Sequence, residues 1–250
     1  MPYMEYICVA GKVTEVIKCF TYRTHTKGEK RAVKKEQTSE AQKRVNLRLA
    51  ERKLRWLMNT NFVDGDYLLR LDFCKVNFPA GSLQMQDLMT KFLTKMRAGY
   101  KKAEDELKYI YVKEIGPRGG RHVHMVINKC DTDLIRKCWT YGGIHIDPLN
   151  SNGQYRKIAA YFIKYAAKTE KTEGQLIGKR WYPSRNLKQP KVYKRVLRAG
   201  HFRAQVKEKA GYYLDKDTVQ HGISDFTGFE YFSYALIKYD AKNDMAAEGG

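Results

Sequence analysis

Residues 121–128 read Arg-His-Val-His-Met-Val-Ile-Asn, an alternation of polar and apolar side chains that is typical of a half-buried β-strand. Side chains on a strand point alternately to its two faces, so His122 and His124 project from the same face. A glycine-rich segment at 116–120 precedes this strand. A segment rich in tyrosine and valine, at 107–115, precedes the glycine-rich segment. The sequence therefore predicts a β-hairpin that carries two imidazoles on one face.

The segments on either side of this hairpin alternate between strand-like and helix-like patterns. We expect, in chain order, a strand at 67–73, a helix at 83–100, the two hairpin strands, a helix at 131–139, a strand at 143–146 and a helix at 154–169. The order β-α-β-β-α-β followed by a helix predicts an α+β fold with a ferredoxin-like (RRM-like) antiparallel sheet.

The chain of 250 residues is long enough for one sizeable core with smaller additions. Residues 1–65 are expected to be an N-terminal extension with a hairpin turned at Gly11, an exposed loop at 21–37 and an arginine-rich helix at about 39–59. Residues 66–190 are expected to be the central α+β domain that contains the histidine-bearing hairpin. Residues 191–250 are expected to be a C-terminal extension that packs on it, in which 192–213 and 231–239 are strands or a mixed extension.

The charge of the chain predicts a polyanionic partner. Lysine and arginine total 47 against 27 acidic residues, which gives a formal net charge of +20. Such a chain usually binds nucleic acid, because neutralised phosphates release their counterions. A generically basic protein is the alternative.

The remaining composition predicts a cytoplasmic protein with no membrane partner; the resemblance described below implies that the cell is a bacterial host. Five scattered cysteines without C-x-x-C spacing indicate reduced thiols. We find neither a run of apolar residues long enough for a membrane helix nor a secretory signal.

The hairpin offers three candidate metal ligands. If residues 116–120 form the loop, Glu114 lies across from His122, and cross-strand neighbours have Cβ atoms about 4.5–5.5 Å apart. Glu114, His122 and His124 together suit a divalent ion, Mn²⁺ or Mg²⁺, better than a closed zinc cage. The alternative is that the two histidines are a chance pair on a hydrogen-bonded strand.

The last expected helix offers a candidate nucleophile. Tyr161, Lys164, Tyr165 and Lys168 follow a spacing of i, i+3, i+4 and i+7, which places all four on one helical face. A tyrosine hydroxyl, with a pKa of about 10, becomes a plausible nucleophile towards phosphate when a metal polarises the P–O bond and a lysine stabilises the added charge. The product would be a 5′-phosphotyrosine with a free 3′-OH. The alternative is a solvated face of tyrosines and lysines.

Taken together, the His-x-His strand and the doubled Tyr-x-x-Lys helix resemble the HUH endonuclease superfamily, whose name denotes histidine, hydrophobe, histidine. The order and spacing of the motifs over about 66–190 are similar to those of rolling-circle replication initiators (Rep) of phages and plasmids. The two tyrosines resemble the two-tyrosine subclass of microvirus-type initiators. The family's first motif falls on 69–73, where this chain departs from the common threonine-bearing pattern.

The resemblance implies a role for each matching residue. His122 and His124 match the metal pair, and Glu114 matches the acidic third ligand. Tyr161 and Tyr165 match the two catalytic tyrosines, which alternate in that subclass, while Lys164 and Lys168 occupy the lysine positions of the doubled motif. Basic residues expected to hold DNA are Arg118, Arg121, Lys157 and Arg185.

The function expected from these residues is site-specific nicking and strand transfer on single-stranded or hairpin origin DNA, which starts rolling-circle replication. The segment 174–180 lacks the spacing and the serine or threonine of a phosphate-binding loop. Unwinding would then need a host helicase and the host replication machinery, as the resemblance implies.

Three other interpretations stay open. The chain could be an HUH transposase or relaxase, although relaxases usually carry a third histidine. It could be a non-catalytic module that binds single-stranded nucleic acid on a ferredoxin-like sheet. It could also be a structural basic protein of the ribosomal kind, which would bind RNA at least as well as DNA.

Overall fold

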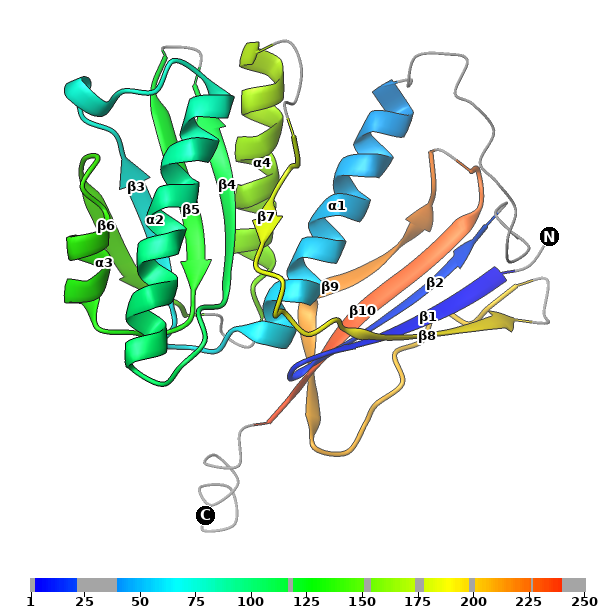
Figure 1. The fold of residues 1–250 in the computed structure, drawn as a ribbon. Coiled ribbons are helices and arrows are strands. Elements are labelled where there is room, and N and C mark those ends of the chain that lie inside the picture. The colour runs from blue at the N-terminus through cyan, green and yellow to red at the C-terminus, as the bar shows by residue number, and fades with distance from the viewer. Residues whose placement is uncertain are drawn as a thin grey trace, which may run out of the picture. The chain divides into compact units, whose positions relative to one another are not determined.

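The structure is a computed structural model that describes residues 3–21, 40–116, 119–150, 154–173, 178–197, 201–225 and 227–239. The chain divides into two compact units. The central unit consists of residues 61–188, and the terminal unit combines residues 1–60 with residues 189–250. Figure 1 labels their helices and strands.

The central unit has the predicted α+β architecture, an antiparallel sheet with strand order β6-β3-β5-β4-β7. Its elements follow the predicted order closely and add a short 3₁₀ helix and an edge strand. In chain order they are β3 (Tyr67–Asp72), η1 (Lys75–Asn77), α2 (Ser82–Lys102), β4 (Tyr109–Ile115), β5 (Arg121–Ile127), α3 (Thr132–Cys138), β6 (Ile144–Pro148), α4 (Arg156–Glu173) and β7 (Tyr182–Pro183).

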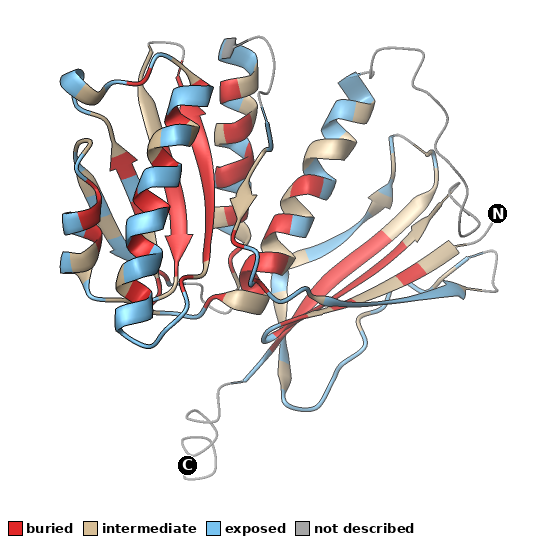
Figure 2. Ribbon diagram, viewed as in Figure 1, coloured by how far each residue is buried: buried red, intermediate tan, exposed pale blue. Residues whose placement is uncertain are grey.

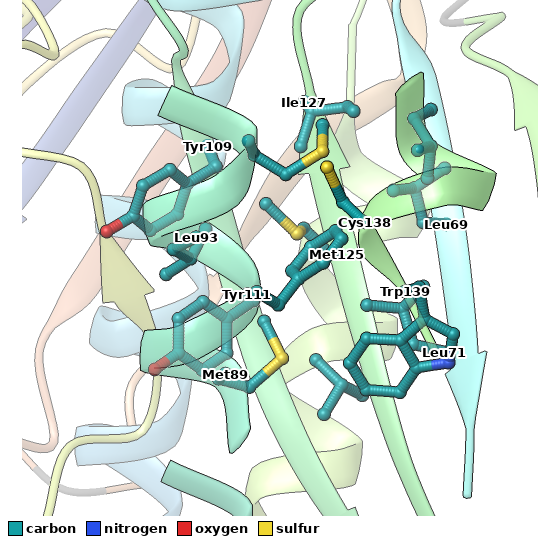
Figure 3. Close-up of a cluster of buried hydrophobic side chains, with 14 of the residues drawn as sticks. Leu69, Leu71, Met89, Leu93, Tyr109, Tyr111, Met125, Ile127, Cys138 and Trp139 are labelled. Atoms are coloured by element: carbon teal, nitrogen blue, oxygen red, sulfur yellow. The ribbon is translucent and has the colours of Figure 1, made fainter. Parts of the chain in front are cut away.

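The main core of the central unit lies between the sheet and helices α2 and α3. Because strand side chains alternate, only one face of each strand contributes to it. Figure 3 shows part of this cluster, in which strand residues such as Leu69, Tyr111 and Met125 pack with Met89 and Trp139. The opposite face of the sheet, which carries the two histidines, is left for α4.

Helix α4 packs on that opposite face through apolar residues, of which Ala159, Phe162 and Ala166 are almost completely buried. Figure 2 shows the buried side of the helix in red. The Thr169 hydroxyl fixes the helix to strand β4: it donates a hydrogen bond to the Lys113 carbonyl and accepts one from the Ile115 N–H, both at 2.9 Å. These contacts set the height of α4 over the sheet.

The terminal unit is a second five-stranded antiparallel sheet, with strand order β8-β1-β2-β10-β9, together with helix α1 (Glu40–Asn61). Gly11, at φ +59°, makes the predicted turn, and a Cβ there would meet the Asn59 carbonyl oxygen at 2.0 Å. The strands are β1 (Tyr3–Ala10), β2 (Val13–Phe20), β8 (Lys191–Leu197), β9 (Tyr212–Ile223) and β10 (Glu230–Lys238).

Strands β2 and β10 pair at the middle of this sheet, so segments from both ends of the chain form one unit. The sequence did not predict this pairing. The segment 192–213 is mixed rather than one strand, because β8 ends at Leu197 and β9 begins at Tyr212. Most of the loop expected at 21–37 lies outside the described residues. Whether residues 66–190 delimit an active domain stays a prediction.

Two expectations from composition can be compared with the structure. All five cysteines are free, as predicted. Within the described part of the chain, no helix combines the length and the apolar character needed to cross a membrane.

A buried carboxylate joins α1 to the terminal sheet. The Glu15 side chain, 8% exposed, accepts hydrogen bonds from the Arg55 guanidinium at 2.7 and 2.8 Å and from the Trp56 indole N–H at 2.6 Å. Since a buried ion pair is costly to break from one side, this carboxylate matters to the stability of the unit.

We predict that Glu15→Ala lowers the free energy of unfolding of the terminal unit by about 3 kcal/mol, because the buried Arg55 charge loses its closer and more buried carboxylate partner. Urea unfolding followed by circular dichroism measures the change. Glu51→Ala is the matched control: Glu51 also pairs with Arg55, at 3.6 Å, but is 27% exposed. Its removal should cost less than about 1 kcal/mol, and equal losses for both variants would contradict the interpretation.

Candidate functional site

The pairing of three strands brings the candidate ligands together on the α4 face of the central sheet. Glu114 on β4 lies opposite His122 on β5, as the hairpin predicts. On the other side of β5, Asp72 of β3 also lies opposite His122, and Arg70 lies opposite His124. Two acidic residues therefore flank the histidine pair, one from each neighbouring strand.

The Glu114 carboxylate is the most heavily engaged group of the site. His124 Nε2 lies 2.8 Å from Glu114 Oε2, and the Lys168 ammonium donates to Glu114 Oε1. Burial opposes ionisation of this carboxyl, but the bonds from His124 and Lys168 outweigh it and lower its pKa to about 2. Glu114 is thus ionised at neutral pH and bonds His124, the diagonal neighbour, rather than His122.

His122 is oriented by a carboxylate of its own. Its Nδ1 lies 2.5 Å from Asp72 Oδ1, which also accepts a hydrogen bond from Arg70 Nε at 3.0 Å, and His145 Nε2 lies 3.4 Å from Asp72 Oδ2. A carboxylate on Nδ1 fixes the ring and leaves Nε2 for another partner. The sequence analysis did not single out Asp72 as a site residue. Its position at the end of β3, on the same face as Arg70, is the signal that could have found it.

These side chains have the chemistry of a divalent-metal site in part. Two ligands at right angles, each about 2.1 Å from a metal, would lie about 3 Å apart, which is close to the observed separation of His124 Nε2 and Glu114 Oε2. As the side chains stand, however, no set of three or more His, Cys, Asp or Glu among the described residues is arranged to hold a metal ion. The ligand types suit a divalent ion, but Glu114 is bonded to His124, and His122 is bonded to Asp72.

Helix α4 places the two tyrosines beside this cluster in different surroundings. The Tyr165 ring stacks on the His124 ring with centroids 3.9 Å apart and planes 7° apart. Burial raises the pKa of the Tyr165 hydroxyl to about 12, with further contributions from Glu114 and Tyr161. Tyr161 packs edge-on against Tyr165 at 5.2 Å and is 56% exposed. One tyrosine is therefore held against the histidine, and the other faces solvent.

The tyrosines also border a cavity of about 330 Å³ between α4 and the sheet. Its lining combines residues of β3, β5 and β6 with one side of α4. They are Leu68, Leu69, Arg70, His124, Asp147, Lys157, Ile158, Tyr161, Phe162 and Tyr165.

The remaining candidate residues lie at various distances from this cluster. Lys164 is exposed, and its ammonium lies 5.9 Å from the centre of the Tyr161 ring. The Arg121 guanidinium lies 4.6 Å from the Phe78 ring centre and donates to the Ala80 carbonyl at 2.7 Å. Arg185 is exposed and follows Ser184, whose N–H bonds the Tyr109 carbonyl at the end of β4 away from Glu114. Arg118 lies outside the described residues.

Comparison with known proteins gives one match. Residues 77–170, which run from η1 through most of α4, match the family described as Replication-associated protein ORF2/G2P. The matched segment includes both histidines, Glu114, both tyrosines and both motif lysines. No curated protein and no solved structure matches the chain significantly. The family match supports a replication-associated protein, a class in which initiators of DNA replication are found.

We predict that Glu114→Gln lowers the free energy of unfolding by about 1–3 kcal/mol at pH 7, because His124 and Lys168 lose a buried charged acceptor. The pKa of the Glu114 carboxyl falls from its ordinary value of 4.5 to about 2 on folding. At a pH between these two values, Glu114 therefore takes up a proton when the protein unfolds. The stabilisation from ionised Glu114 is therefore complete above pH 4.5 and is lost as the pH falls towards 2.

Urea unfolding of the two proteins in the presence of a chelator, at pH 7 and at pH 3, measures the difference. The gap between wild type and variant should shrink at the lower pH. A gap that is independent of pH would show that the Glu114 charge contributes nothing to folding.

Proposed function

We propose that this protein is a metal-dependent endonuclease and strand transferase that nicks single-stranded DNA at a specific site to initiate rolling-circle replication. The observation that carries the proposal is the stack of Tyr165 on His124, with Glu114 bound to the same imidazole. A candidate nucleophile and two candidate metal ligands are thereby in direct contact. The match to a replication-associated family supports the same biological process.

In the proposed reaction a tyrosine hydroxyl oxygen attacks the scissile phosphorus, and the bond from phosphorus to the 3′ oxygen breaks. The phenol loses a proton and the leaving oxygen gains one, so a 5′-phosphotyrosine and a free 3′-OH are formed. Attack by a 3′-OH on the phosphotyrosine reverses the step and joins strands. No external energy source is needed, because one phosphodiester replaces another.

A bound Mg²⁺ or Mn²⁺ would supply positive charge to polarise the scissile phosphate. His122, His124 and Glu114 are the residues proposed to hold it. The protein's own contribution is to prepare these ligands: Asp72 holds the His122 ring by Nδ1, and Glu114 is kept ionised by its neighbours. The Lys168 ammonium pairs with the Glu114 carboxylate and balances its charge.

The two tyrosines suit two roles. Tyr165 is protonated at neutral pH and stacked on His124, so its attack needs local positive charge to stabilise the phenolate. Tyr161 is more exposed and can meet a strand that approaches from solvent. One tyrosine could stay covalently bound to the DNA while the other attacks a second phosphate. Strands would then be transferred without release of a DNA end, as in the two-tyrosine initiators that the chain resembles.

The basic surface is proposed to hold single-stranded or hairpin origin DNA. Lys157 lines the cavity beside both tyrosines, and Lys164 lies beside Tyr161. Lysines placed near a phosphate act as point charges and contribute to binding in a salt-dependent way. Unwinding of duplex DNA is assigned to a host helicase.

We predict that wild-type protein incubated with pooled single-stranded oligonucleotides and Mn²⁺ gains the mass of an oligonucleotide fragment. Intact-mass spectrometry measures the gain, and peptide mapping should place it on Tyr161 or Tyr165. Chelator should abolish it, and Tyr161→Phe with Tyr165→Phe should abolish it while DNA binding changes less than about threefold, since phenylalanine keeps both rings.

Tyr193→Phe is a matched control, because Tyr193 is an exposed tyrosine of the terminal unit. Adduct formation in the double variant would refute the tyrosine mechanism. Absence of any adduct on the cognate origin strand, with tight binding retained without metal, would favour the non-catalytic binding module. Genes flanking the coding sequence would distinguish replication from transposition or conjugation.

A further inference from the structure

The cavity beside the tyrosines is mostly apolar, which a phosphate site would not require. Its walls include Leu68, Ile158 and Phe162, and the rings of Tyr161 and Tyr165 border it. Apolar and aromatic surfaces bind the faces of nucleobases, and stacking on an aromatic side chain contributes about 1–3 kcal/mol per base. The composition of the walls therefore matches a base better than a sugar-phosphate chain.

The polar residues of the cavity have complementary chemistry. Arg70 and Lys157 supply hydrogen-bond donors and positive charge, and Asp147 supplies an acidic acceptor. Leu68 lies opposite Asp147 in the pairing of β3 with β6, which makes Arg70 and Asp147 diagonal neighbours on one face. The backbones of diagonal neighbours lie about 7–8 Å apart, so two side chains of this length can reach different edges of one planar ring.

The size of the cavity is suitable for a small ligand. Binding sites for small molecules usually have volumes of about 300–1,000 Å³, and this cavity, at about 330 Å³, lies at the lower end of that range. One unstacked base with part of its sugar is a ligand of that scale.

We propose that this cavity binds a single unstacked nucleobase of the substrate strand, next to the phosphate that Tyr161 or Tyr165 attacks, and that it prefers guanine. The proposal rests on the proposed function and adds a source of sequence specificity to it. A protein can recognise the identity of a base in single-stranded DNA, because the Watson–Crick edge of an unpaired base is free to form hydrogen bonds.

Guanine fits the polar residues because it offers both kinds of partner at once. Its N1–H and N2–H₂ groups are adjacent donors, which a carboxylate such as that of Asp147 accepts as a pair. Its O6 and N7 atoms are adjacent acceptors, which an arginine such as Arg70 bonds through two donors. Each of the other three bases presents only a single donor to the carboxylate.

The test measures binding without cleavage, so that it does not depend on the nicking reaction. Full-length protein in chelator is titrated into fluorescently labelled oligo-dT that carries one central guanine, adenine, cytosine or abasic site, and anisotropy reports the affinity. We expect guanine to bind at least about fivefold more tightly than the abasic site, given the usual discrimination of a good bidentate pair. Equal affinities for all four oligonucleotides would overturn the proposal.

Two variants assign the preference to the cavity. Ile158→Trp fills it and should abolish the guanine preference, so that the four oligonucleotides bind alike; Ala160→Trp, at an exposed position of the same helix, is its control and should keep the preference. Asp147→Asn should reduce the preference for guanine over adenine at least threefold without disturbing the fold, because Asp147 is exposed. Asp87→Asn, on α2 over the opposite face, makes the same charge change elsewhere.

The failures of the two proposals can be told apart. Guanine preference that vanishes in Ile158→Trp, in a protein that forms no tyrosine adduct, would support the base site and refute the nuclease. Tyrosine adducts together with a guanine preference that both cavity variants retain would support the nuclease and refute the base site.

Discussion

The bond between the buried Glu114 carboxylate and His124 is the interaction on which the arrangement of the central unit depends. It links β4 to β5 on the face that α4 covers, and Lys168 extends the link to the helix itself. Burial alone would favour the neutral, protonated form of this side chain. It stays ionised because cationic or hydrogen-bond-donating groups contact it. The bonds that hold the three elements together therefore also keep a negatively charged oxygen against the His124 ring.

Much of the central unit could be predicted from the sequence, because its information is local. The alternation around His122 and His124 specifies a strand face, and the short connection to β4 specifies the register that places Glu114 opposite His122. The helical spacing of Tyr161 and Tyr165 likewise specifies a shared face. These features need only the periodicities of strands and helices.

What could not be predicted depends on contacts between distant segments. The pairing of β2 with β10 joins residues that are more than 200 positions apart, and no periodicity reports such a partner. The role of Asp72 similarly arises from the neighbouring strand, since β3 meets β5 only after α2 and β4 have intervened. The sequence pattern also does not predict which hydrogen-bond partner a side chain takes. The register places Glu114 opposite His122, yet the Glu114 carboxylate bonds His124. The register of the hairpin was thus predictable, but the partner that each side chain bonds was not.

The interrupted course of the terminal unit has a consequence for the order of events on the ribosome. The central unit is one continuous segment, residues 61–188, so all of its strands are synthesised before β9 and β10. The terminal sheet cannot close until β10 arrives to cover β2, which until then exposes an unpaired edge to any other strand in reach. During synthesis the segment that carries the histidines and tyrosines can reach its final form first. For part of synthesis, the segment with the histidines and tyrosines is therefore complete while strand β2 of the first hairpin still lacks its neighbour β10.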